Sequence, residues 1–227
     1  MSLEAKDIDD DGDIDLISAG CYDENNKVAI WFLHIDHDQE TSMHCHPNKT
    51  TGLILLDGVA EISFLTNKIS VESLQKVMIR KGLFHSTKAI SKDGANIFEI
   101  ETPVNKHDLV RLADKYGRKA KPYEGKKAEY EKGKNDLTIG LNNEDKTYRF
   151  SNCIIEVKHL HDTKIFNQMN DPQNIIFLDG GILTENNVLV AQAGDVVTIY
   201  TLKKLIELFP ILDKSTKIMI INSDGKL

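Results

Sequence analysis

Short apolar runs rich in β-branched and aromatic residues alternate along the chain with clusters of Gly, Asn, Asp and Ser. Runs of this length and composition predict β-strands, and the clusters between them predict turns. Their even spacing in the amino-terminal part is typical of an all-β sandwich or barrel, and it favours a jelly roll. The predicted strands of this part are residues 28–36, 53–56, 59–65, 69–71, 75–79, 85–89 and 96–102.

The same pattern occurs a second time in the carboxy-terminal part. The run at 175–180 parallels the run at 53–58, and each ends in Asp-Gly. Residues 188–197 parallel 77–85 more loosely, with Gly194 matching Gly82, and the last apolar run at 217–222 mirrors 96–101. Internal similarity of this kind predicts two duplicated β units.

Two helices are predicted beside the strands. A short one is expected at 107–116, with Gly117 as its stop, and an amphipathic one at 201–209, just before Pro210. The segment Arg111–Lys134 carries nine basic and four acidic residues. We interpret it as a linker between domains or a mobile flap. Phosphate binding by this segment is the alternative to a simple solvated linker.

Two histidines, His44 and His46, lie two positions apart just before the apolar run at 53–58. On a β-strand such residues point to the same face, so both imidazoles can reach one interior point, which is a metal-ligand geometry. A third histidine, His85, follows the glycine turn at Gly82 and begins another predicted strand.

Together these residues resemble the two motifs of the cupin superfamily, HxH followed by Glu and Gly, and later PxGxxH. Thr51 stands at the Glu position and Arg80 at the Pro position. In that family the HxH strand and the late-histidine strand face each other across a small β-barrel, where two histidines, the Glu and the late histidine hold a divalent metal. The resemblance implies that the metal ligands are His44, His46 and His85, and it leaves the fourth ligand open. The residues of this chain that match the two motifs are His44, His46, Gly58, Gly82 and His85.

The fourth ligand and the metal are both undetermined by the sequence. Glu99 and Glu101 share one face of the last strand of the first unit. One of them is a candidate ligand, but we favour a solvated face for the pair. Imidazole suits several transition metals, so Zn, Fe, Mn and Ni are not distinguished. Cys45 faces away from the two histidines and is interpreted as a packing residue.

The second copy lacks the ligands. In the register of the repeat, Phe166, Gln168 and Val197 take the places of the three histidines. The chain therefore resembles a bicupin with one metal-binding barrel and one degenerate barrel. We expect a cupin barrel with the metal site at 1–105, a helix and basic linker at 106–148, and a degenerate second barrel at 149–227.

The acidic segment Asp7–Asp15 has the spacing D-x-D-x-D-G-x-x-D, which resembles calcium loops of EF-hand and dockerin type. Ser18 occupies the twelfth position, where an EF-hand has a bidentate Glu. We favour an acidic turn over a calcium site.

The composition limits the partners. The formal net charge of -7 argues against nucleic acid or an anionic membrane as the main partner. No apolar run is long enough to span a bilayer, and the three cysteines have no CxxC spacing. We expect a cytoplasmic protein that forms a homodimer through sheet edges.

Fold alone does not fix function, so three hypotheses stay open. The first is a metal-dependent isomerase or epimerase that acts on a small polar molecule such as a sugar or sugar phosphate. The second is an Fe(II) dioxygenase with a three-histidine site. The third is a non-catalytic cupin that binds a small molecule or has a structural role.

Overall fold

A computed structural model describes residues 27–105, 108–113, 147–150, 152–169 and 173–224, together with a short strand pair formed by β1 (Ser2–Leu3) and β11 (Leu137–Thr138). The acidic segment Asp7–Asp15 lies outside the described residues, and so does the basic segment from residue 114 onward. No helix among the described residues is long and apolar enough to cross a membrane.

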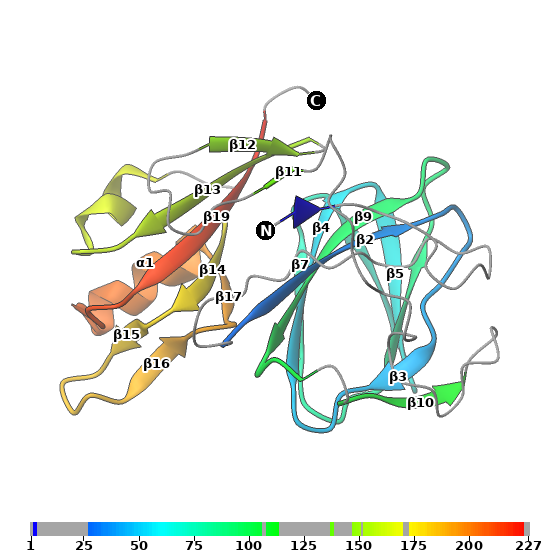
Figure 1. Ribbon diagram of the computed structural model, residues 1–227, viewed down its shortest axis with the longest axis horizontal. Coiled ribbons are helices and arrows are strands. Elements are labelled where there is room, and N and C mark those ends of the chain that lie inside the picture. The colour runs from blue at the N-terminus through cyan, green and yellow to red at the C-terminus, as the bar shows by residue number, and fades with distance from the viewer. Residues whose placement is uncertain are drawn as a thin grey trace.

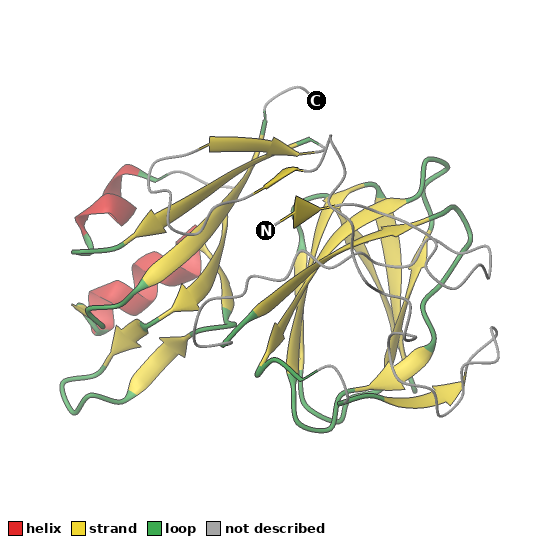
Figure 2. Cartoon of the chain, viewed as in Figure 1, coloured by secondary structure: helices red, strands yellow, loops and turns green. Residues whose placement is uncertain are grey.

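The amino-terminal unit is a barrel of two antiparallel sheets (Figures 1 and 2). Each sheet joins strands that are distant in sequence, as expected for a jelly roll, so the predicted all-β class is confirmed. The first sheet has the order β2 (Ala29–Ile35), β9 (Ala95–Thr102), β4 (Thr50–Asp57) and β7 (Lys76–Ile79). The second has the order β10 (Val110–Ala113), β3 (Met43–Cys45), β8 (His85–Ala89), β5 (Val59–Phe64) and β6 (Lys68–Glu72).

The carboxy-terminal unit repeats the first sheet and three strands of the second (Figure 1). Its large sheet has the order β12 (Thr147–Phe150), β13 (Cys153–His159), β19 (Lys217–Ser223), β14 (Gln173–Asp179) and β17 (Val196–Thr198). A small sheet has the order β16 (Leu189–Gln192), β15 (Gly181–Leu183) and β18 (Ile211–Leu212). The helices of this unit are η1 (Lys164–Gln168) and α1 (Ile199–Leu208).

One helix prediction is confirmed and the other is wrong. The helix expected at 201–209 is α1, which is capped by Thr198 through a 3.2 Å hydrogen bond from the amide of Thr201. The helix expected at 107–116 is instead a strand over Val110–Ala113, which pairs with β3 at the edge of the second sheet. Pairing with β3 satisfies the backbone of this short segment, and this tertiary contact outweighs its helical spacing.

The register of the repeat also differs from the prediction at Gly194. Strand β17 pairs with β14 as β7 pairs with β4, so Val197 corresponds to Val77 and not to His85. Gly194 and Leu74 both have positive φ, and their amides donate to equivalent carbonyls, Phe177 and Leu55, at 2.8 and 2.7 Å. The two residues make the same turn, so Gly194 is the counterpart of Leu74 and not of Gly82.

The positions that correspond to the histidines of the first unit fall on helices in the second unit. Phe166, the counterpart of His44, lies on η1 and packs in an apolar core together with Leu202 of α1. Leu212 pairs with β15 as Ala89 pairs with β5, so the chain position that corresponds to His85 falls at Leu208, the last residue of α1. The interior of this unit is an apolar core.

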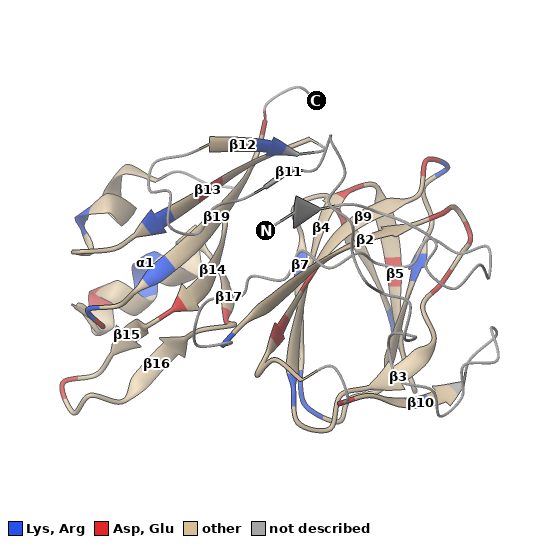
Figure 3. Ribbon diagram, in the orientation of Figure 1, with Lys and Arg blue, Asp and Glu red and all other residues tan. Residues whose placement is uncertain are grey.

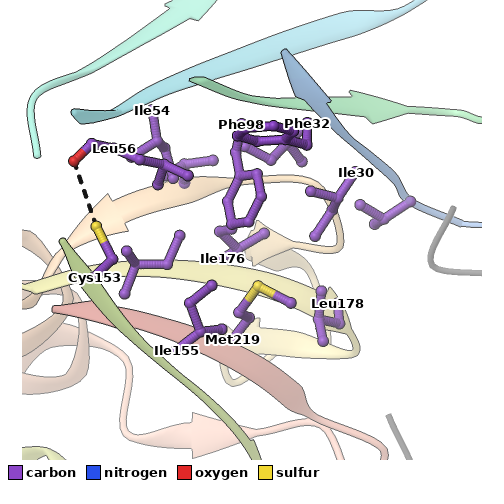
Figure 4. Packing of buried hydrophobic residues seen from close by; sticks show 14 of the residues in the cluster. Ile30, Phe32, Ile54, Leu56, Phe98, Cys153, Ile155, Ile176, Leu178 and Met219 are labelled. Atoms are coloured by element: carbon purple, nitrogen blue, oxygen red, sulfur yellow. Dashed lines mark hydrogen bonds between the residues drawn. The ribbon is translucent and has the colours of Figure 1, made fainter. Parts of the chain in front are cut away.

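The two large sheets pack face to face and share a core. Side chains on β9 alternate between this shared core and the barrel interior, so that Phe98 and Ile100 face the second unit while Ile97 packs inside the barrel. The Sγ of Cys153 lies 3.5 Å from the carbonyl oxygen of Leu56 across this interface. Figure 4 shows the facing residues Ile30, Phe32, Ile54, Leu56 and Phe98 from one sheet, and Cys153, Ile155, Ile176, Leu178 and Met219 from the other.

Candidate metal centre

The barrel brings the three predicted histidines together. His44 on β3 and His85 on β8 are direct cross-strand partners, and His46 follows just after β3. All three are buried, with exposed fractions of 7%, 2% and 3% for His44, His85 and His46. The ring centroid of His44 lies 4.4 Å from the ring centroid of His85 and 5.1 Å from that of His46. The ring centroids of His46 and His85 lie 5.8 Å apart.

Each ring is fixed through Nδ1 by a backbone carbonyl. The acceptors are Ser42 for His44 and Asp108 for His46, both at 2.6 Å, and Leu83 for His85 at 3.1 Å. Because a carbonyl oxygen can only accept, Nδ1 carries the proton and the lone pair is on Nε2. This arrangement orients imidazoles that bind metals through Nε2.

Burial keeps the three rings neutral. It lowers the pKa of His85 to about 4. Burial also lowers the pKa of His44 well below its usual value, with a further contribution from the neighbouring His85 and His46. The pKa of His46 is lowered by burial and by the ammonium group of Lys49. At neutral pH all three imidazoles are therefore in the form that binds a metal.

Glu99 joins the three histidines. One donor atom from each of His44, His46, His85 and Glu99 can be chosen so that all four atoms lie within 4.8 Å of one another. Glu99 is only 4% exposed, and Glu101 is equally buried, so the predicted solvated face for this pair is wrong. The second unit covers the other face of β9, and the two carboxylates lie on the face of this strand towards His46. Figure 3 shows acidic residues of β9 in red.

These residues fit a divalent transition metal. The Nε2 of His46 is buried without a hydrogen-bond partner, as expected for an atom that binds an ion. Ligands bonded at about 2.1 Å to one ion lie no more than about 4.2 Å apart, so small side-chain rotations suffice to close the set. Three imidazoles and a carboxylate suit Zn, Fe, Mn or Ni.

Thr51, at the family's Glu position, is buried inside the barrel and does not supply a carboxylate. It lies on β4 directly opposite Glu101 of β9, and its exposed fraction is 1%. Its Oγ1 has no hydrogen-bond partner. The carboxylates of this site thus come from β9, the strand beside the one that carries the family's Glu.

A second carboxylate and its partners lie beside the cluster. Oε1 of Glu101 is 3.5 Å from Nε2 of His46 and forms a buried ion pair with Nζ of Lys49, while Oε2 accepts from Nε1 of Trp31 at 2.9 Å. Neither Lys49 nor Trp31 was predicted from the sequence as a residue of the site. Lys49 follows Pro47 and Asn48, a sequence that is typical of a turn. The only feature that marked Trp31 was its place on a predicted strand.

Asp108 was also missed. Its carboxylate accepts hydrogen bonds from the amide and side chain of Asn48 and from the amide of Lys49, each at 2.8 Å. Its own carbonyl accepts from His46. Asp108 therefore ties the chain before β10 to the loop that carries His46.

Cys45 lies between the two histidines and is 5% exposed. Burial raises the pKa of its thiol. Both observations agree with its interpretation as a packing residue.

No protein-family model and no curated protein matches the sequence. Similar solved structures include an uncharacterized conserved protein with a double-stranded β-helix domain from Klebsiella pneumoniae (18% identity, 40% of this chain and 77% of that chain, TM-score 0.37). KdgF from a Halomonas species is similar at 13% identity over 45% of this chain and 89% of that chain (TM-score 0.39).

A third similar structure is described as a sugar phosphate isomerase from a cupin superfamily, from Silicibacter pomeroyi. It is 9% identical over 42% of this chain and 64% of that chain, with a TM-score of 0.37. Each of the three covers less than half of this chain. The strand order of the first unit is that of a double-stranded β-helix, so the cupin resemblance holds at the level of the fold.

Proposed function

We propose that the first unit holds one divalent transition metal ion on His44, His46, His85 and Glu99, and that this centre belongs to an enzyme acting on a small polar molecule. A sugar or sugar phosphate in an isomerase or epimerase reaction is the substrate class we favour. The observation that carries the proposal is the convergence of four buried donor groups from β3, β8 and β9.

A bound ion of this kind acts as a Lewis acid that polarises a carbonyl or a pair of hydroxyl groups. The chain's own residues prepare the site for it. The three neutral imidazoles are held with Nε2 towards one point, and the carboxylate of Glu99 compensates part of the positive charge. The carboxylate of Glu101, 3.5 Å from Nε2 of His46, is the candidate proton acceptor beside the ligands.

The two other hypotheses have less support. A three-histidine dioxygenase site does not account for the buried Glu99 within the cluster. A purely structural metal does not need the second buried carboxylate, Glu101, beside the ligands. Iron content together with oxygen uptake, but without sugar binding, would favour the dioxygenase.

Metal analysis of the purified protein tests the centre. We expect about one transition metal ion per chain in the wild type and its loss in His44→Ala, because three buried donors without the fourth bind much more weakly. His161→Ala removes an exposed histidine from the sequence His159-Leu160-His161 of the second unit and is the matched control, which should keep its metal. Stoichiometric metal in His44→Ala contradicts the ligand assignment. Binding of a sugar phosphate by the metal-loaded wild type but not by His44→Ala would support the substrate class.

A further inference from the structure

Beside the histidines, β9 carries one buried carboxylate more than the proposed centre uses. Oε1 of Glu101 lies 3.5 Å from Nε2 of His46, which is closer than Oε1 of Glu99 at 3.9 Å. Two ligands bonded at about 2.1 Å to one ion are separated by roughly 3 to 3.5 Å at ordinary coordination angles. On distance from His46 alone, Glu101 is as well placed as Glu99 to bind the ion.

Both oxygens of Glu101 are already engaged. Nζ of Lys49 pairs with Oε1, and Nε1 of Trp31 donates to Oε2. Lys49 is 3% exposed and Trp31 is 4% exposed, so neither interaction is weakened by water. The amide of Lys49 is in turn bound by Asp108, and Trp31 lies on β2 directly opposite Glu99.

We infer that Lys49 and Trp31 are positioning residues that keep Glu101 out of the coordination sphere of the metal. The ion then has one carboxylate ligand and keeps an open position for a substrate oxygen. This inference rests on the proposed metal centre and adds the residues that set its ligand number. Nothing in the cupin motifs points to Lys49 or Trp31.

The electrostatics give the expected effect of removing Lys49. A buried carboxylate that loses its cationic partner becomes strongly unfavourable unless another positive charge replaces it. The divalent ion is that charge, because Glu101 already lies beside His46. A rotation of the Glu101 side chain then adds a ligand to the ion, which raises the coordination number and removes the open position.

Cobalt(II) is the probe, because its visible absorption weakens and shifts as ligands are added. We compare the wild type with Lys49→Met, Glu101→Gln and the double variant, each loaded with Co²⁺ alone. Lys49→Met is expected to show a weaker, shifted spectrum and roughly tenfold tighter Co²⁺ binding, the scale of changes made around metal ligands. Glu101→Gln and the double variant are expected to keep the wild-type spectrum. Glu99→Gln should alter or abolish that spectrum.

Trp31→Phe covers the case in which Lys49→Met does not fold. It releases Oε2 alone and should shift the spectrum in the same direction by a smaller amount. The inference is overturned if Glu101→Gln changes the spectrum as Glu99→Gln does, or if the folded Lys49→Met and Trp31→Phe proteins both keep the wild-type spectrum. A wild type that binds no Co²⁺ instead contradicts the metal centre itself, which separates the two failures.

Discussion

His85 shows how a residue of the site is made ready by its surroundings. The ring is 2% exposed, its Nδ1 donates to the carbonyl of Leu83, and burial lowers its pKa to about 4. The ring therefore resists protonation over a wide pH range in the folded protein. In an unfolded chain the same group takes up a proton near pH 6.5.

This difference predicts how the stability of the metal-free protein depends on pH. Between pH 6.5 and about 4 the unfolded state binds a proton at His85 that the folded state does not, so the free energy of unfolding falls as pH falls. The contribution of His85 is fully present above pH 6.5 and amounts to roughly 3 kcal/mol over the window. Urea denaturation at several pH values measures it.

His85→Gln is the control for this measurement, because it removes the titrating group and keeps a polar side chain. Its free energy of unfolding should depend less steeply on pH than that of the wild type between pH 6.5 and 4. Equal pH dependence of the two proteins contradicts the prediction.

Strand β10 and the short segment before it show how an edge element supports the site. Asp108 precedes β10 and binds the loop that leads from His46 to β4 through Asn48 and Lys49. The carbonyl of the same residue orients His46. This small element therefore fixes both the approach to β4 and one of the metal ligands.

Replacement of Asp108 by Ala should destabilise the first unit. Two backbone amides and the side-chain amide of Asn48 lose their acceptor, and we expect the free energy of unfolding to fall by roughly 2–4 kcal/mol. The carbonyl that accepts from His46 is retained, so metal content should persist in the folded protein. Glu72→Ala, at an exposed position on β6, is the control and should stay within about 0.5 kcal/mol of the wild type. Equal stability of the two variants would contradict the assigned role of Asp108.

The elements also show how far the sequence could predict this protein. The central strands were predictable because alternation and apolar runs mark them directly. The burial of Glu99 and Glu101 could not be predicted, because charged residues that alternate with Phe98 and Ile100 indicate a strand with one solvated face. In this fold both faces of β9 are covered, one by the barrel interior and one by the second unit. β10 was missed because a four-residue edge strand is too short for its period to be told from a helical turn.

At the scale of the whole molecule, the two units depend on one core. Phe98 is completely buried between the large sheets, and it meets Phe32 edge to face with the ring centroids 6.5 Å apart. Because each sheet covers the other, neither unit can open without exposing apolar surface of both. We expect the units to unfold together.

Phe98→Ala should therefore lower the free energy of unfolding of the entire protein by roughly 3–5 kcal/mol. Fluorescence of Trp31, the single tryptophan, and far-UV circular dichroism should report the same transition in urea. Leu65→Ala, at a position that is 60% exposed, is the matched control and should change stability by no more than about 0.5 kcal/mol. Two separate transitions in the wild type contradict a shared core.

Because the positions that correspond to the ligand histidines fall on η1 and α1, we expect that point mutations cannot give the carboxy-terminal half a metal centre like that of the first unit. Histidines introduced at Phe166, Gln168 and Leu208 would stand on helical backbone, and Leu208 is 71% exposed, so their imidazoles would not converge. Such a triple variant should bind no more metal than the natural sequence does. The route of the main chain, more than the identity of three side chains, is what we expect to prevent a metal centre of this kind in the second unit.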